Sequence, residues 1–325
     1  MIIGNESDIN VSLTSVLHAW YSFKKGKTKN HEFDTFTYSL ESNLHNLHQD
    51  LLSHTYQHGH YRTFYLTDTK KRTISVASIR DRIVHRLIYD YLVSIFDKRF
   101  IYDAWSCREG KGLLGAINRA GDLLKSFPNA YVWRCDITKF FDSIDQEFLK
   151  KTIRRRVSGE RVLWLTDIVI DSFFSYAPGR GMPIGNLTSQ IFCNIYMNEL
   201  DHYVSHTIRP LAYMRYGDDF LLIIPDHESA KKTKEAVTLY ITNELKLTVH
   251  KTNNIIIPTR QGIHFLGCDI YPNGRRLRKK MYPRIKKRLN LANLSSYRSL
   301  ILTHDKEKDV KWIDWNIANI IESMV

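Results

Sequence analysis

The stretch LAYMRYGDDFLLIIP, residues 211–225, decides the fold of this chain. Two apolar runs of β-strand type flank Gly217, Asp218 and Asp219. Glycine and aspartate tolerate the backbone conformations of a tight turn, so the stretch predicts a β-hairpin with both aspartates at its bend. Taken alone, the triplet is better explained as an ordinary solvated turn. Other segments reverse that preference.

A third carboxylate, Asp136, ends another strand-like run at residues 131–137. Adjacent carboxylates buried between apolar strands need cations to neutralise them, and all-oxygen ligation suits Mg²⁺. Two ions roughly 3.5–4 Å apart can activate an attacking hydroxyl and stabilise the leaving oxygen of a phosphoryl transfer. The three aspartates therefore predict polymerase chemistry with two Mg²⁺ per site, for which Mn²⁺ is a possible substitute.

The composition agrees with a protein that handles nucleic acid. The 325 residues include 47 Lys and Arg against 34 Asp and Glu, a net charge of +13, and such a balance is the electrostatic footprint of a polyanion binder. The length predicts two or three compact units. The cysteines are far apart, which excludes a zinc ribbon or small disulfide scaffold and predicts core thiols in a reducing cytosol; they are Cys107, Cys135, Cys193 and Cys268.

Hydrophobic patterning predicts a chain without a membrane partner. Its apolar runs are far shorter than the ~20 residues of a membrane-spanning helix. The first ten residues lack a charged and then apolar leader, so we expect a cytoplasmic protein. Periodicity predicts helices within residues 10–58, two strands within 61–79 around a turn at 68–72, and a helix over 83–95. The five histidines of residues 44–60 follow no ligand spacing and indicate a polar helix and loop.

Five segments, in chain order, resemble the conserved blocks of reverse transcriptases. They are KRTISVASIRDRIVHRLIYDYL (71–92), CDITKFFDSID (135–145), GMPIGNLTSQIFCNIYMNELD (181–201), YGDD (216–219) and HFLGCDIY (264–271). The resemblance covers about residues 60–272 and implies an α+β, right-hand fold with fingers, palm and a short thumb. It implies a helical extension of the fingers at 1–58, fingers at 59–130, a palm at 131–272 with a fingers insertion at about 146–182, and a basic helical thumb at 273–325.

Within this family, the chain is most similar to the reverse transcriptases of diversity-generating retroelements. Group II intron and retroviral enzymes usually carry Gln before the glycine of the middle block and Ser-Pro after it, whereas this chain has Ile184-Gly185 and Ser189-Gln190. The branched Ile184 can only pack, so the resemblance implies error-prone synthesis, especially opposite template adenine. It also implies a structured template RNA, a cDNA product, dNTP substrates and a small basic accessory variability protein.

Three other functions stay open at this stage. A stand-alone phage-defence reverse transcriptase that copies a noncoding RNA shares the same core blocks. An inactive RNA-binding scaffold would keep the fold without the chemistry. An RNA-dependent RNA polymerase would share the YGDD box. About 50 residues follow residue 272, so we expect no RNase H, integrase or large maturase module.

The residue five positions after Asp136 bears on the choice of sugar. It is Phe141, whose ring would collide with a ribose 2′-hydroxyl, so deoxynucleotides are the expected substrate. Phe140 stands beside it, and one of the two rings is expected to be core. The resemblance also adds Ile137 to the metal site and Ile184 and Gly185 to the nucleotide site.

The remaining expected contacts are cationic or line the nucleic acid. For the triphosphate we expect Arg72 first and Arg80 second, since Arg binds phosphate oxygens bidentately; Lys251 acts near the pyrophosphate or is a surface lysine. Asn194 faces template or nucleotide, or satisfies a buried polar group. The other expected nucleic-acid contacts are Gln190, Tyr216, Gly267, Arg275, Arg276, Arg278, Lys279, Lys280, Lys286 and Lys287. The basic run at 275–288 either tracks duplex phosphates or is a solvated helix face.

Overall fold

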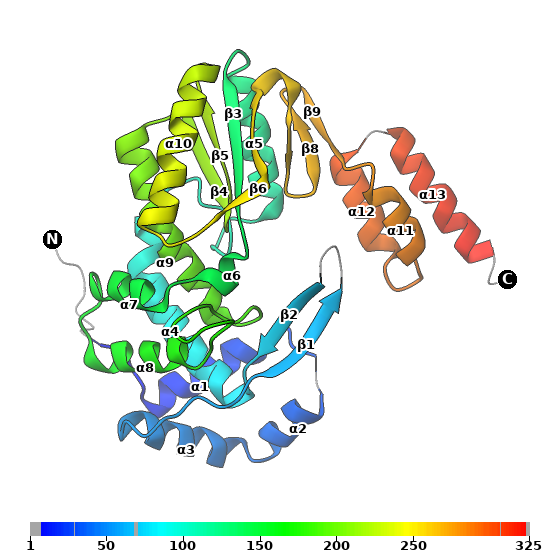
Figure 1. Ribbon diagram of the computed structural model, residues 1–325. Helices are drawn as coiled ribbons and strands as arrows, with labels where there is room; N and C mark the ends of the chain where they lie inside the picture. Colours follow the sequence, from blue (N-terminus) through cyan, green and yellow to red (C-terminus); the bar gives the residue numbers. More distant parts are fainter. Residues whose placement is uncertain (1–7, 29, 68–70, 306, 323–325) are drawn as a thin grey trace.

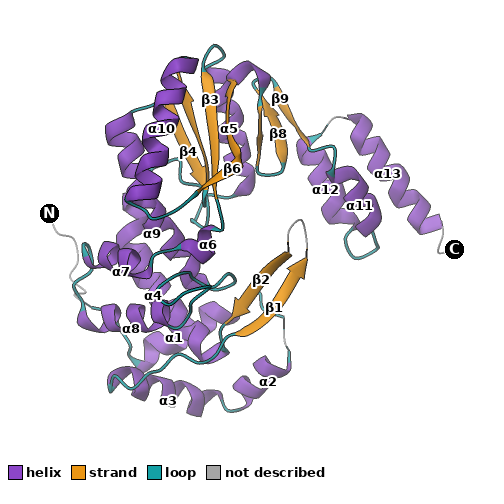
Figure 2. Ribbon diagram, in the orientation of Figure 1, coloured by secondary structure: helices purple, strands orange, loops and turns teal. Residues whose placement is uncertain are grey.

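The computed structural model describes residues 8–28, 30–67, 71–305 and 307–322. Helices and antiparallel sheets are both prominent: a four-stranded sheet lies above a helical region with a long hairpin, and three helices stand to one side (Figures 1 and 2). This confirms the predicted α+β class. Among the described residues, no helix combines the length and the hydrophobicity needed to cross a membrane.

The central sheet carries the decisive hairpin. Its strands lie in the order β4 (Ala212–Tyr216), β5 (Asp219–Ile224), β3 (Tyr131–Ile137) and β6 (Val249–Pro258), and all neighbours are antiparallel. Tyr216 pairs with Asp219, so only Gly217 and Asp218 form the turn. Gly217 has φ +66°, a conformation that glycine adopts without strain. The predicted hairpin is therefore confirmed.

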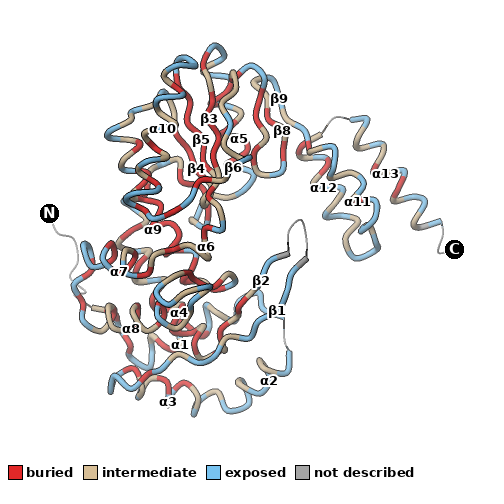
Figure 3. The backbone as a smooth tube through the Cα atoms, in the orientation of Figure 1, coloured by how far each residue is buried: buried red, intermediate tan, exposed pale blue. Residues whose placement is uncertain are grey.

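Both faces of this sheet are buried, which explains the uninterrupted apolar run of β5. Phe220, Leu222 and Ile224 belong to one core with α9 (Leu187–Tyr203) and α10 (His227–Asn243). Leu221 and Ile223 belong to a second core with α5 (Leu113–Ser126). Successive side chains of a strand point to opposite faces, so a sheet covered on both sides needs apolar residues at every position. Figure 3 shows β3, β4 and β5 buried along most of their length, whereas the edge strand β6 is mostly half-buried or exposed.

The helical region below the sheet confirms the helices and strands predicted in the first 100 residues. It contains α1 (Leu13–Lys24), α2 (His31–Tyr38), α3 (Leu40–Leu52), α4 (Ile79–Phe96), α7 (Gln146–Arg154) and α8 (Glu160–Asp171). The hairpin of β1 (Arg62–Thr67) and β2 (Lys71–Val76) projects from it. Positions 68–70 of the predicted turn lie outside the described residues. Helix α4 packs against α1 and α9 and so joins this region to the sheet.

The chain ends in a second small sheet and three helices. They are β7 (Ile263–Phe265), β8 (Cys268–Tyr271), β9 (Gly274–Leu277), α11 (Met281–Arg288), α12 (Leu294–His304) and α13 (Glu307–Glu322). The helical character predicted from residue 273 is wrong at its start, because residues 274–277 form β9 and pair with β8. Short helical turns complete the fold: Asp97–Arg99, Phe140–Ser143 (α6), Val204–Ile208 and Thr259–Gln261.

Two further expectations need correction. Helix α5 lies within the range predicted for the fingers, yet it packs on β4 and β8 of the sheet region. Its alanines Ala116 and Ala120 are fully buried there. Such small residues allow the helix to pack closely on the strands. The cysteines are all free, but Cys107 is exposed and so is not a core thiol, unlike Cys135, Cys193 and Cys268.

Candidate active site

The three aspartates meet at one end of the central sheet. Asp136 follows Cys135, the last β3 residue paired with β5, and Asp218 and Asp219 lie at the β4–β5 turn. Opposite Asp136 the register of β6 shifts, since Cys135 pairs with Asn254 but Ile137 pairs with Val249. Residues 250–253 therefore bulge beside Asp136, and Asn253 Nδ2 lies 3.2 Å from Asp136 Oδ2.

The electrostatics of this end show crowded negative charge. The pKa of Asp218 is raised to about 7, first by burial and then by the neighbouring Asp136 carboxylate. Burial also raises the pKa of Asp219 to about 6, although the guanidinium of Arg134 opposes that shift. Each carboxylate is thus more costly to ionise than in water, and a bound cation would relieve that cost.

Asp219 is engaged by an arginine that sequence reasoning missed. Arg134 donates from Nε to Asp219 Oδ1 at 3.0 Å and from Nη2 to Oδ2 at 2.6 Å. Asp136 and Asp218 lie together, whereas Asp219 is turned to Arg134. Accordingly, no group of three or more His, Cys, Asp or Glu side chains is arranged to hold a metal ion within the part of the chain that the structure describes.

A buried ion pair braces the turn from beneath. Arg215 and Asp201 are both fully buried, and Arg215 bonds both Asp201 oxygens at 2.8–3.0 Å. Arg215 Nη1 also donates to the Gly217 carbonyl at 3.2 Å and to Asn194 Oδ1 at 2.9 Å. Because Asp201 and Asn194 belong to α9, this network ties the backbone of the turn to that helix.

The donor chemistry fits a hard divalent cation. Carboxylate oxygens of Asp136 and Asp218, together with the backbone carbonyl of Ile137 at the end of β3, are the oxygen ligands that Mg²⁺ prefers. Asp219 is instead paired with Arg134, which competes with a cation for its oxygens. The residues therefore fit a divalent ion that the carboxylates of Asp136 and Asp218 bind, while Asp219 is paired with Arg134.

Three of the residues expected at the nucleotide, Phe141, Ile184 and Gly185, lie in segments that are joined to each other and to the β1–β2 hairpin. Phe140 is buried, while Phe141 is half-buried and makes an edge-to-face contact with it, so Phe140 is the core ring. The Phe141 carbonyl accepts from Met182 N at 2.8 Å, and the Ile184 carbonyl accepts from Ser75 N at 3.0 Å. Segment 182–186 thus joins α6 to β2.

Gly185 is required by this close approach. Its φ is +115°, and a Cβ there would lie 2.9 Å from Ile74 Cγ2 of β2. Asn186 strengthens the junction, donating from Nδ2 to the Ser75 carbonyl at 2.7 Å and accepting from Ala77 N at 3.1 Å. Sequence analysis missed Asn186 as a junction residue, because its partners are about 110 residues away in the chain.

The expected phosphate-binding cations differ in their availability. Arg72 is exposed on β2, and Lys251 is exposed in the β6 bulge beside Asp136. Arg80 is committed internally: it pairs with Asp50 at 2.6 Å, donates to the Gln57 carbonyl and lies over the Tyr56 ring. Its guanidinium thus ties α4 to α3 and the segment after it, and binding of triphosphate by Arg80 stays a prediction.

Of four other residues expected to contact nucleic acid, two are exposed and two are not. Gln190 is exposed near the start of α9, and Gly267 is exposed at the β7–β8 turn with φ +85°. Tyr216 is half-buried beside the catalytic turn. Asn194 is buried, donating to the Ser106 carbonyl and accepting from Arg215. These contacts support the alternative that Asn194 satisfies buried polar groups, and its contact with template stays a prediction.

The residues of the basic run at 275–288 also differ in whether they are exposed or bonded within the fold. Arg275 donates to Asn118 Oδ1 and to the Thr303 carbonyl, which ties β9 to α5 and α12, and its contact with nucleic acid stays a prediction. Arg276 lies 3.6 Å from Asp269 and donates to Tyr271 Oη. Arg278 is half-buried. The exposed lysines are Lys279, Lys280, Lys286 and Lys287.

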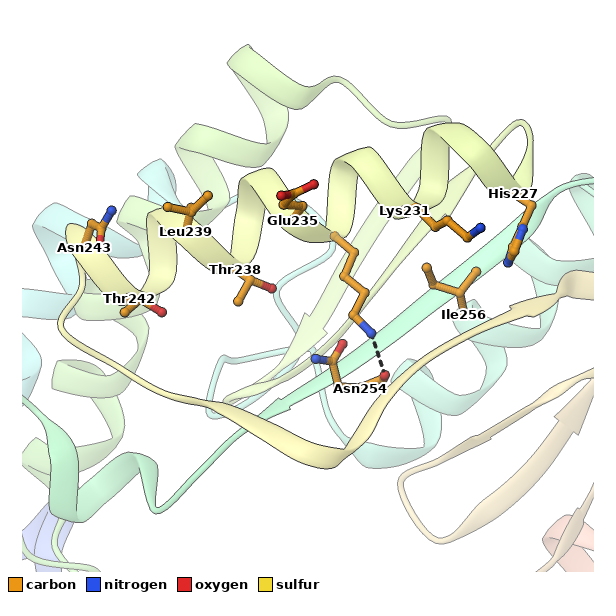
Figure 4. A pocket seen from close by; sticks show the side chains of 10 residues that line it. His227, Lys231, Glu235, Thr238, Leu239, Thr242, Asn243, Asn254 and Ile256 are labelled. Atoms are coloured by element: carbon orange, nitrogen blue, oxygen red, sulfur yellow. Dashed lines mark hydrogen bonds between the residues drawn. The ribbon is translucent and has the colours of Figure 1, made fainter.

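A hollow of about 610 Å³ lies elsewhere, between α10 and β6 (Figure 4). Lys234 lines this hollow and donates to the Asn254 carbonyl at 3.0 Å. None of the residues expected to bind metal, nucleotide or nucleic acid lines this hollow. The chemistry that the aspartates support is therefore not located in it.

The carboxylates lie at the turn of the β4–β5 hairpin, which α9 supports and which the projecting β1–β2 hairpin faces. This arrangement is typical of polymerases with the right-hand fold. A family model described as reverse transcriptase (RNA-dependent DNA polymerase) matches residues 66–270. The match covers more than half of the chain, which therefore belongs to the reverse transcriptase family.

Individual relatives agree with this membership. The chain is 26% identical over 263 residues to protein YkfC of Escherichia coli K12, covering 68% of this chain and 69% of YkfC. It is 22% identical over 321 residues to the group II intron-encoded protein LtrA of Lactococcus lactis, covering 77% of this chain and 53% of LtrA. It thus spans only about half of LtrA.

Among solved structures, apo telomerase from Candida tropicalis is similar with a TM-score of 0.51 and 14% identity, over 76% of this chain and 52% of that one. At this identity the likeness concerns the fold alone. Together with the family match, it confirms the predicted right-hand polymerase fold.

The raised pKa values predict a pH dependence of stability for the metal-free protein. A carboxyl whose pKa is about 7 folded and near 3.9 unfolded keeps its proton longer in the native state, so stability falls as pH rises between those values. Asp219, at about 6, acts in the same direction. In EDTA, we expect the melting temperature of wild type to fall from pH 5.5 to 8.

Asp218→Asn is expected to reduce this fall and to melt above wild type at pH 8. Thermal unfolding at both pH values measures the effect, with Asp122→Asn, a change at an exposed carboxylate on α5, as the control. An identical pH slope in wild type and Asp218→Asn would contradict the assigned charge crowding.

Proposed function

We propose that this chain is an RNA-directed DNA polymerase that extends a primer by two-metal phosphoryl transfer. The observation that carries the proposal is the meeting of Asp136 and Asp218 at the end of β3 and the β4–β5 turn, where burial and mutual repulsion raise the pKa of Asp218. Such a site attracts divalent cations, and membership of the reverse transcriptase family supports the same chemistry.

In this proposal Asp136, Asp218 and the Ile137 carbonyl hold Mg²⁺, or Mn²⁺ in its place, and Asp219 completes the set. Bound divalent ions stabilise the negative charge on the attacking 3′-oxygen and the leaving pyrophosphate. Arg72 binds the triphosphate, and Lys251 lies on the side of the departing pyrophosphate. Arg215 and Asp201 position the turn without touching substrate.

The proposed path of nucleic acid follows the exposed residues. Gln190 faces the template, Tyr216 and Gly267 face the primer end, and Lys279, Lys280, Lys286 and Lys287 contact phosphates of the duplex with Arg276 and Arg278. We assign fingers to the helical region with β1 and β2, palm to the central sheet with α5, α9 and α10, and thumb to α11–α13. This assignment moves the fingers–palm boundary to a point before α5.

Phe141 is proposed to exclude ribonucleotides. Its half-buried ring is supported by Phe140 and lies in the segment directly after Asp136. Replacing it with alanine removes the ring that would collide with a 2′-hydroxyl. We therefore expect Phe141→Ala to lower the ratio of kcat/KM for dNTP over rNTP at least tenfold in primer extension on an RNA template.

Tyr38→Ala, which removes an aromatic ring that is 94% exposed on α2, is the control and should leave the ratio unchanged. Persistence of full discrimination in Phe141→Ala would place the sugar gate at another residue.

The finer proposal is that synthesis is error-prone and serves mutagenic retrohoming in a diversity-generating retroelement, with a structured template RNA and a basic accessory protein as partners. It is supported by Ile184 and by the IGNLTSQ pattern of residues 184–190. Ile184 is half-buried where segment 182–186 meets β2, and its side chain offers no hydrogen bond to an incoming base pair.

Ile184→Gln is expected to lower the misincorporation frequency opposite template adenine several-fold. The measurement is sequencing of cDNA made from a defined RNA with all four dNTPs and Mg²⁺. Ile184→Val keeps a branched apolar side chain and should retain the wild-type error spectrum. An unchanged spectrum in Ile184→Gln would remove Ile184 from the fidelity determinants.

A further inference from the structure

The Arg134–Asp219 ion pair is built into the register of the sheet. Arg134 and Asp136 are two residues apart on β3, so their side chains share a face. Arg134 pairs with Leu221 of β5, which makes Asp219 its diagonal neighbour on that same face. A long side chain spans such a diagonal. The guanidinium therefore reaches Asp219 without any irregularity in the strands.

The pair is sheltered and fills both oxygens of the carboxylate. The Arg134 side chain is 9% exposed and that of Asp219 is 17% exposed. Both guanidinium bonds are short, and each ends on a different oxygen of Asp219. The ring of Phe265 on β7 lies 5.9 Å from Arg134 Cζ and covers the guanidinium. Bidentate pairs of this kind are strong, and removing one partner from a sheltered pair is costly.

The same pair explains why only two of the three aspartates lie together. Asp136 and Asp218 have no guanidinium partner among the contacts that the structure describes, whereas Asp219 has both oxygens occupied. A divalent cation that uses Asp219 must compete with the two Arg134 hydrogen bonds for this carboxylate. A cation held at Asp136 and Asp218 also experiences the positive charge of Arg134 nearby.

We propose that Arg134 is a positioning residue that withholds Asp219 from divalent metal, so that exchange of Asp219 from guanidinium to metal limits metal affinity. This inference rests on the proposed function, because it assumes that Asp219 is a metal ligand during synthesis. It assigns Arg134 no contact with substrate.

The test is Mn²⁺ binding without RNA, primer or nucleotide, followed by the loss of the free-ion electron paramagnetic resonance signal. Arg134→Gln should bind Mn²⁺ at least threefold more tightly than wild type, because the competitor of the metal is gone. Arg134→Lys should also bind more tightly than wild type, because lysine keeps the charge but cannot occupy both Asp219 oxygens. In primer extension, the half-saturating Mg²⁺ concentration of both variants should be lower than that of wild type.

Two controls test whether the effect depends on the contact between Arg134 and Asp219. Arg119→Gln removes another arginine that binds a carboxylate bidentately, that of Asp103, and should leave Mn²⁺ affinity unchanged. In an Asp219→Asn background, Arg134→Lys should have no effect on affinity, because the carboxylate that distinguishes the two side chains is absent. Circular dichroism checks that each variant is folded, and Arg134→Lys is the conservative variant if Arg134→Gln does not fold.

Mn²⁺ affinity that is unchanged or weaker in Arg134→Gln and Arg134→Lys would overturn the inference. Tighter binding in Arg134→Gln with wild-type affinity in Arg134→Lys would also overturn it, by showing a plain charge effect. The outcome is distinct from failure of the proposed function, which appears as a wild-type protein that binds Mn²⁺ but makes no cDNA.

Discussion

Crowding of carboxylates at the end of a doubly buried sheet is the constraint on which the rest of this structure depends. The apolar strands β3 and β5 bring Asp136 and Asp218 together where water is limited, and the pKa of Asp218 rises to about 7 in response. Such an arrangement is costly for folding and is retained for what it binds. The surrounding polar contacts offset part of the negative charge of these aspartates.

Two arginines provide that balance in different ways. Arg215 lies beneath the turn, where Asp201 neutralises it completely, so it contributes shape rather than net charge at the site. Arg134 lies on the face of the sheet that carries Asp136 and is paired with Asp219 itself. The first arginine holds the backbone that presents Asp218, and the second holds the carboxylate of Asp219. Loss of Arg215 would change the geometry of the turn, whereas loss of Arg134 would release Asp219.

Local sequence patterns predicted the helices and strands well, but they did not predict the hydrogen-bond and ion-pair partners of individual side chains. The β4–β5 hairpin and α9 follow from residue types that lie next to one another, and both appear where the sequence places them. The internal contacts of Asn194, Arg80 and Arg275 depend on hydrogen-bond partners that the fold brings from 21 to 157 residues away. Arg134 was missed because its partnership depends on the register between β3 and β5, which alternation alone does not reveal.

The same distinction separates the family from its finer role. Motif order identified a reverse transcriptase, and the match over residues 66–270 agrees. The proposed finer role rests on Ile184 and the IGNLTSQ pattern of residues 184–190, and it involves a template RNA and a partner protein as well as this chain. The three-aspartate site is common to all of these roles, so it is the part of the account that can be tested without knowing the partners.

The most direct measurement is the rate of primer extension on an RNA template by wild type, Asp218→Asn and Glu147→Gln, with Mg²⁺ and with EDTA. Glu147 is exposed on α7 and serves as a charge-matched control. The account predicts Mg²⁺-dependent synthesis by wild type and Glu147→Gln, and a loss of at least a hundredfold in Asp218→Asn. Extension by Asp218→Asn at the wild-type rate, or synthesis by wild type in EDTA, would contradict it.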